Sequence, residues 1–167
     1  MKPIRVISIL ASALLLTAVC GDGSAPADAA QRPGRVCPDP ARPCPGFKPH
    51  DLSFVLPPGG TARAEDRSEP FFAVILRSGP RCSIPDEQRR AAQLLFPRNK
   101  VFSQRFECDD DVENNITYTN VAASAGFLAV HAGATRESAD AVLARVRATR
   151  RFPGANLRRM QVVRVHP

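Results

Sequence analysis

The sequence predicts an α+β domain in which two β-α-β units form one four-stranded antiparallel sheet with both helices on one face. Three observations support this prediction. The apolar stretches at residues 71–76 and 127–132 are alike, and a helical pattern follows each of them. A Phe-Pro pair ends both helical patterns, and Phe96 and Phe152 each lie 25 residues after the first residue of their stretch. Such spacing is typical of a duplicated unit, and it gives the element order β-α-β-β-α-β.

Local patterns justify the elements in turn. Aromatic and β-branched runs bounded by Pro, Gly or acidic turns predict strands. They occur at residues 51–57, 71–76, 100–108, 116–121, 127–132 and 159–165. The segment 114–125 leaves two alternatives open, a loop or an additional strand of a hairpin that would disturb the simple order.

Two helices are expected between these strands. The first begins near Pro85, has acids in its first turn, and carries an apolar stripe of Ala91, Leu94 and Leu95. The second begins after Thr135, a favourable N-cap residue. Its apolar stripe consists of Ala139, Val142, Leu143 and Val146.

The first residues have the features of a secretory signal, which we place at residues 1–20. Lys2 and Arg5 precede an apolar run of 14 residues, too short to cross a bilayer comfortably. Ordinary cleavage fits the small-x-small pattern at residues 27–29, whereas a lipoprotein signal would use Cys20. By either route we expect export to a periplasm or cell envelope. A lipid anchor at Cys20 would then be the only attachment to a membrane.

The cysteines agree with export. Apart from Cys20 the chain contains Cys37, Cys44, Cys82 and Cys108, and an even number in an exported protein indicates two disulfides. Three connectivities are possible, and the spacing favours Cys37–Cys44 and Cys82–Cys108. A zinc site is the competing interpretation, but the CxxC pair and neighbouring histidines that it needs are missing. We therefore expect neither a metal nor another cofactor.

Composition suggests where the domain begins. Residues 21–50 are rich in Pro, Ala and Gly without apolar periodicity, which is typical of a linker. This linker would contain a small loop closed by Cys37 and Cys44. The domain is expected at residues 51–167, as a core at 70–167 with an N-terminal extension.

Residues 127–146 carry a resemblance to a known family. Their strand ends at Gly133, and a short turn leads into a helix with Ala at one position and Leu two turns later. This pattern resembles the second half of a SPOR (sporulation-related repeat) domain, and residues 71–97 are similar to the first half. The resemblance implies a ferredoxin-like fold in a bacterial envelope protein. It also implies binding to peptidoglycan glycan strands stripped of stem peptides.

Strand alternation predicts which residues would meet such a ligand. One face of the sheet would carry Phe71, Ile75, Arg77, Phe127 and His131, pointing away from the helices. Gln104, Tyr118 and Gln161 are further candidates for contacts to sugar hydroxyls. The alternative is that additional strands or the segment 51–69 cover this face and make these residues part of the core.

The charge distribution and the acidic motif limit the functions that this chain can have. The formal net charge is +7, and seven arginines but no acidic residue follow Asp140. This excess fits either a solvated basic surface or attraction to a polyanion, and export argues against nucleic acid as the partner. The aspartates at 109–111 lack the spacing of a calcium loop.

We find no nucleophile elbow, phosphate loop or HExxH motif, and expect no enzyme. The leading hypothesis is a peptidoglycan-binding module. The alternative is a periplasmic protein-interaction module on the same fold, such as an inhibitor or an assembly factor, with another envelope protein as its partner.

Overall fold

The computed structural model describes residues 32–58, 64–108, 115–122 and 124–166 of the 167-residue chain. The predicted signal with Cys20 and the acidic turn at 109–111 lie outside the described residues. The described part is an α+β structure with two helices and antiparallel sheets, as expected.

The largest sheet has four antiparallel strands. They are β4 (Phe71–Pro80), β5 (Val101–Ser103), β7 (Ala125–Gly133) and β8 (Asn156–Met160). Their spatial order is β5-β7-β4-β8, so the two long strands lie in the centre and the two short strands form the edges. The two long strands are the matched apolar stretches of the sequence.

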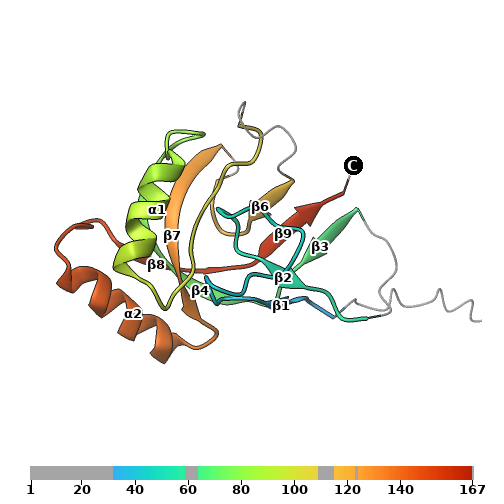
Figure 1. The fold of residues 1–167 in the computed structure, drawn as a ribbon, viewed down its shortest axis with the longest axis horizontal. Helices are drawn as coiled ribbons and strands as arrows, with labels where there is room; N and C mark the ends of the chain where they lie inside the picture. Colours follow the sequence, from blue (N-terminus) through green and yellow to red (C-terminus); the bar gives the residue numbers. More distant parts are fainter. Residues whose placement is uncertain (1–31, 59–63, 109–114, 123, 167) are drawn as a thin grey trace, which may run out of the picture. The chain divides into compact units, whose positions relative to one another are not determined.

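Both helices lie on one side of this sheet (Figure 1). Helix α2 (Arg136–Ala148) follows β7, and Thr135 caps it by accepting a hydrogen bond from the Ser138 N–H. Its predicted stripe is confirmed, because Ala139, Val142 and Val146 are buried and Leu143 packs against them.

Helix α1 (Asp86–Leu95) has a different buried face from the predicted one. Arg89 and Ala92 are buried, whereas Leu94 is 83% exposed. The helix is short, and Phe96 just beyond its end enters the core instead. Of the predicted stripe, Leu95 packs against the core, whereas the prediction was wrong for Ala91 and Leu94, which are exposed.

A second layer covers the opposite side of the large sheet (Figure 1). It contains a three-stranded sheet in the order β3-β9-β6, built from β3 (Glu65–Arg67), β6 (Ile116–Tyr118) and β9 (Val162–Val165). The pair β1 (Arg35–Val36) and β2 (Phe54–Val55) belongs to the same layer. The large sheet is thus packed on both faces.

Each face of the large sheet has its own apolar cluster. Val74, Leu76, Leu128 and Val130 pack toward the helices. Phe71, Ala73, Ile75, Phe127 and Ala129 pack toward the second layer. The predicted alternation along β4 and β7 is confirmed by these two clusters.

Four expected strands differ from the structure. The segment 51–57 forms a strand only at Phe54–Val55. The segment 159–165 is split at Gln161 into β8 and β9, which belong to different sheets. The segment 100–108 forms a strand only at residues 101–103. The segment at 116–121 supplies β6, an additional strand that pairs with β9 rather than with a neighbour in the large sheet.

The expected linker at 21–50 also needs correction within its described part. Val36 is buried in the second-layer cluster, and the Gly34 N–H donates to the Arg67 carbonyl oxygen at 2.8 Å. A β-bridge joins Gly34 to Ser68. Two-residue strands of this kind gain stability only from tertiary packing, so their local sequence carries no periodic signal.

The two favoured disulfides are present. One joins Cys37 to Cys44, and the other joins Cys82, just after β4, to Cys108, beyond β5. They fit a protein that folds in an oxidising compartment outside the cytosol.

Candidate functional site

The sheet face predicted to bind a ligand is covered. Phe71 and Phe127 are each 1% exposed, and Ile75 and Tyr118 are also buried. The Tyr118 ring lies 5.2 Å from the Phe127 ring and 5.1 Å from the Phe102 ring, centroid to centroid. These side chains form the aromatic centre of the second-layer core, as the covered-face alternative predicted.

Tyr118 links two parts of the second layer, β6 and the segment before β2, through its hydroxyl. Its phenolic oxygen accepts a hydrogen bond from the Leu52 N–H at 3.1 Å. Burial raises the pKa of this phenol well above its usual value. The role of this side chain in the structure is packing and a buried hydrogen bond, not contact with a ligand at the surface.

The two glutamines proposed as sugar contacts are held by the backbone. Gln104 is buried beyond the end of β5, and its Nε2 donates to the Ala125 carbonyl oxygen at 3.1 Å. Gln161 lies at the crossover between β8 and β9, and its Nε2 donates to the Ser68 carbonyl oxygen at 2.8 Å. Both side chains thereby fix loop geometry.

Arg77 lies on the other face from the one expected. A register irregularity between Ile75 and Arg77 shifts the alternation, so that Arg77 pairs with Leu128. Its Nη1 donates to Gln88 Oε1 of α1 at 3.0 Å. A β-bulge places one extra residue on a strand and reverses the faces beyond it.

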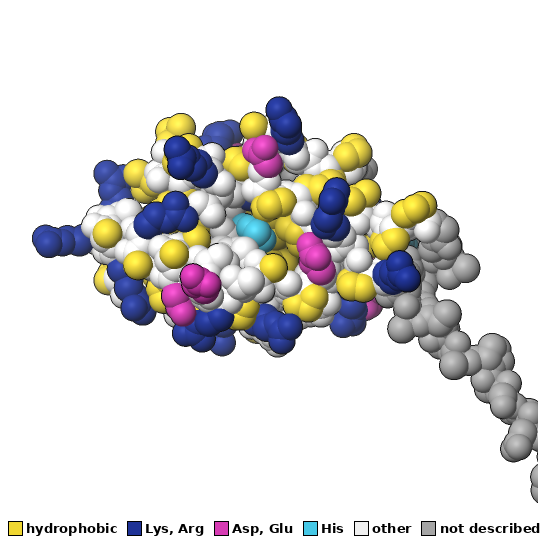
Figure 2. Space-filling model, turned by 90° about the horizontal axis from the view of Figure 1, so that it is seen from below, with side chains coloured by type: hydrophobic (Ala, Val, Ile, Leu, Met, Phe, Trp, Pro, Cys, Tyr) yellow, Lys and Arg dark blue, Asp and Glu magenta, His cyan; other side chains and the backbone are white. Residues whose placement is uncertain are grey.

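His131 lies near the end of β7, with its ring 5.5 Å from the Phe71 ring. Burial lowers the pKa of its imidazole to about 4. His131 also lines a groove of about 740 Å³ between α2 and the segment 97–99. The charged residues that line this groove are Asp39, Arg98 and Arg145. In another view of the molecule, Figure 2 shows a histidine in a hollow, with Lys and Arg side chains spread around it.

A hollow lies beside the covered face, and we call it the corner hollow. Its volume is about 440 Å³. It is lined by Ile75, Ser78, Asn120, Val121, Ala122, Ala125, Phe127, Asn156 and Arg158. The hollow therefore lies beside β8, where β4 and β7 continue beyond the second layer.

Polar side chains form the rim of the corner hollow. Asn120 Nδ2 donates to the Arg159 carbonyl oxygen at 2.6 Å, and Arg158 Nε donates to Asn156 Oδ1 at 3.1 Å. None of the described residues that line it is acidic. Its apolar floor and cationic rim suit a ligand with carboxylates or hydroxyls beside an apolar group.

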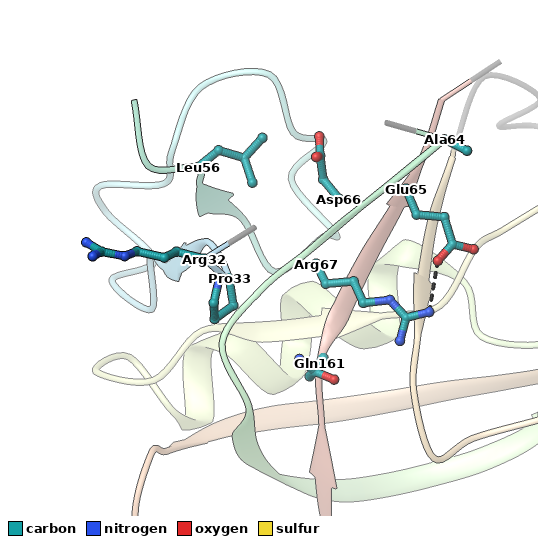
Figure 3. A pocket seen from close by; sticks show the side chains of 8 residues that line it. All are labelled: Arg32, Pro33, Leu56, Ala64, Glu65, Asp66, Arg67 and Gln161. Carbon is teal, nitrogen blue, oxygen red and sulfur yellow. Dashed lines mark hydrogen bonds and ion pairs between the residues drawn. The ribbon is translucent and has the colours of Figure 1, made fainter. Parts of the chain in front are cut away.

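A second hollow, at the edge of the second layer, has a different character (Figure 3). Its volume is about 590 Å³, and β3 contributes both acidic and basic side chains to it. Glu65 pairs with Arg67 at 2.9 Å, and Asp66 Oδ2 lies 2.6 Å from His166 Nε2. Arg32 adds a further basic side chain, so the lining of this hollow carries charges of both signs.

Polar side chains also gather behind the β5 edge. The Lys100 ammonium donates to the Pro49 carbonyl oxygen at 2.6 Å, and Arg105 Nη1 donates to the Ile84 carbonyl oxygen at 3.1 Å. Burial and then the Arg105 guanidinium lower the pKa of His50 to about 4. Burial likewise lowers the pKa of Lys100. These contacts attach the loop at residues 47–51 to the sheet.

The rim residues of the corner hollow were not singled out from the sequence. Asn120 has a φ of 60°, a left-handed conformation that Asn tolerates better than most residues, and this was the one local signal available. Arg158 was visible only as one of seven arginines after Asp140. Its placement depends on the pairing of β8 with β4.

Comparisons of the chain with protein-family models, with curated proteins and with solved structures found no match. Within the described ranges, no group of three or more His, Cys, Asp or Glu side chains is arranged to hold a metal ion. No helix among the same residues has the length and apolar character needed to span a bilayer.

Proposed function

We propose that this chain is a non-catalytic, exported binding module whose ligand is another protein of the bacterial envelope. The observation that carries the proposal is the burial of Phe71 and Phe127, each 1% exposed, beneath the second layer. With both rings covered, this face offers no aromatic surface for stacking on sugars. Exposed strand edges, arginines and small hollows are features of surfaces that bind other proteins.

The topology supports a ferredoxin-like core for this module. With β4, β5, β7 and β8 as its first to fourth strands, the spatial order is second-third-first-fourth, and both helices pack on one face. The similarity of residues 127–146 to SPOR domains supports an envelope location, and the two disulfides fit an oxidising compartment.

Peptidoglycan is the second candidate ligand, and the corner hollow favours it. Asn120, Asn156 and Arg158 bring hydrogen-bonding side chains to one rim, as a site for sugar hydroxyls and the lactyl carboxylate would need. In this alternative the glycan binds in the hollow and not across the aromatic face.

Two assays on the full disulfide-bonded chain separate the candidates. The first measures co-sedimentation with purified peptidoglycan sacculi, with and without amidase treatment. The second cross-links the chain in an envelope fraction and identifies its partners by mass spectrometry. The proposal predicts a saturable cross-linked protein partner and no enrichment on either form of sacculus. Sacculus binding without a protein partner would replace it with the glycan alternative.

A further inference from the structure

We propose that the outer edge of β8 is the docking site for an extended, acidic segment of the partner protein, which adds to the sheet as a fifth strand. This inference rests on the proposed function, because it specifies how that partner binds. It is carried by the pairing of β8, by the faces on which its arginines lie, and by the corner hollow beside it.

Strand β8 forms one edge of the four-stranded sheet. Strand β8 is the last in the order β5-β7-β4-β8, so within the described residues a strand pairs with it on one side only. Its partners in β4 are residues 71–75, whereas β4 continues to Pro80. The backbone groups on the outer side of an edge strand are available to an added strand.

A side chain already forms one hydrogen bond of the kind that an added strand would form. Asn120 Nδ2 donates to the Arg159 carbonyl oxygen at 2.6 Å. This amide occupies a carbonyl group of β8 in the way that a backbone N–H of a neighbouring strand would. An incoming peptide can take over the bond, because Asn120 itself is exposed and can turn aside.

The faces of β8 set the side-chain requirements of the occupant. Asn156 and Arg158 pair with Ile75 and Ala73, so they point to the side of the corner hollow. Arg159 pairs with Phe72 and therefore points to the helix side. Neighbouring residues of an added strand also alternate between the faces, so two consecutive acids can meet Arg158 and Arg159.

The corner hollow gives the occupant a second contact. Ile75 and Phe127 form its floor next to Arg158. On the added strand, the residue two positions from the acid that meets Arg158 lies on the same face. Its side chain therefore comes close to this floor. Ile75 and Phe127 are themselves buried, so the apolar surface that an apolar residue there would bury is that of the half-buried Val121 and the exposed Ala122.

Charge excludes a second copy of this chain as the occupant. Pairing of β8 with another β8 would bring Arg158 and Arg159 close to the same arginines of the other molecule, and like charges across strands are destabilising. An acidic strand has the opposite interaction with both residues. The same arginines therefore oppose self-association and favour an acidic partner.

The experiment uses the full disulfide-bonded chain and a short labelled peptide in which Glu alternates with Val or Thr and one position carries consecutive acids. Fluorescence anisotropy measures its affinity at low salt. Two further peptides carry N-methyl groups on alternate backbone amides, one on the odd set and one on the even set. Only one set can donate to β8, so one methylated peptide should lose binding and the other should retain it.

Substitutions then locate the site. The pair Arg158→Glu and Arg159→Glu should weaken binding by about tenfold or more. The matched pair Arg98→Glu and Arg147→Glu makes the same change of charge on exposed residues elsewhere, and should change affinity by less than about twofold. Chemical-shift perturbations in labelled protein should concentrate on residues 156–160 and on Asn120.

Several results would overturn the inference. They are no binding by the acidic peptide, equal binding by both methylated peptides, equal loss in both arginine pairs, or dimerisation of the free chain through β8. If the cross-linking assay still captures an envelope protein with the Arg158→Glu/Arg159→Glu chain, the edge is not the site although the proposed function stands. If neither chain captures a protein, the proposed function itself fails.

Discussion

The two edges of the four-stranded sheet are closed by different means. At the β5 edge, the Ser103 N–H donates to the His50 carbonyl oxygen at 2.9 Å, and the Lys100 N–H donates to the Pro38 carbonyl oxygen at 3.3 Å. The segment 38–50 therefore acts as a cover for this strand. At the β8 edge, among the residues that the structure describes, the contact to the backbone is a single side-chain amide, that of Asn120.

The difference shows how this chain treats strands that would otherwise pair with other molecules. The β5 edge is covered by the segment 38–50 of the same chain. The Cys82–Cys108 disulfide, with Cys108 buried, fixes the chain just beyond β5. The β8 edge carries exposed arginines, which discourage pairing with a like-charged strand but leave an acidic one acceptable. One edge therefore serves stability, and the other is available for recognition.

The largest expected effect is on stability and comes from Phe102 of β5. Its side chain is fully buried and contacts the rings of Phe71, Tyr118 and Phe127. Phe102→Ala should lower the free energy of unfolding by about 3–5 kcal/mol, measured by denaturant titration.

The half-buried Leu157 of β8 is the matched control for Phe102. Leu157→Ala should cost less than half as much, because part of this side chain already contacts water. Equal costs at the two positions would mean that the two edges are equally integrated into the core.

Removal of the Cys82–Cys108 disulfide is expected to follow in size. The bridge closes a loop with a sequence separation of 26, and the chain-entropy relation gives about 3–4 kcal/mol for Cys82→Ala/Cys108→Ala. The Cys37–Cys44 bridge has a separation of 7 and should contribute about 2–3 kcal/mol. Thermal unfolding of the two double variants checks this order, and the reverse order would contradict the entropic account.

Acidification should loosen the β5 side before the β8 edge. Burial lowers the pKa values of His50 and His131 to about 4, below the usual 6.5 for histidine. The unfolded chain then binds more protons between these values, so stability is complete above pH 6.5 and is lost as the pH falls toward 4. We expect a loss of about 2 kcal/mol for each of the two histidines between pH 7 and pH 5.

The variant His131→Gln sharpens the test of acidification. It removes one of the two titrating groups, so the slope of stability against pH should become shallower across the same interval. An unchanged slope would show that protonation of His131 does not contribute to the loss of stability at low pH.

The smallest effect on stability is expected at the arginines of β8. Both Arg158 and Arg159 are exposed, and Arg158→Glu/Arg159→Glu should change the free energy of unfolding by less than about 0.5 kcal/mol. Circular dichroism and denaturant titration check this result. A cost above about 2 kcal/mol would mean that these side chains stabilise the sheet instead of serving a partner.

The helices and the central sheet followed from local patterns. The duplicated strands, Thr135 at the start of α2 and both disulfides were all predictable, because periodicity, capping and cysteine spacing are local or countable features. The bulge near Arg77 was not, since it depends on the register of β4 against β7. The second layer was predicted only as an alternative, because its strands have two to four residues and no repeat of their own.

The candidate site was harder to predict than the fold. The sequence placed Phe71, Ile75 and Phe127 on one face correctly but did not decide whether that face was covered. Covering depends on long-range pairs such as Leu52 with Tyr118, which no window of sequence reveals. The corner hollow lies beside the covered face, and the edge strand β8 brings Arg158 to it.

Amide hydrogen exchange in the free protein tests the difference between the edges most directly. The amides of Lys100 and Ser103 are bonded to the segment 38–50 and should exchange slowly, at rates set by larger openings of the structure. The alternate amides of residues 156–160 that point away from β4 should exchange much faster, and those that point toward β4 should be protected. Protection of every amide in β8 to the level of Ser103 would show that its outer edge is already covered, and would contradict the open-edge account.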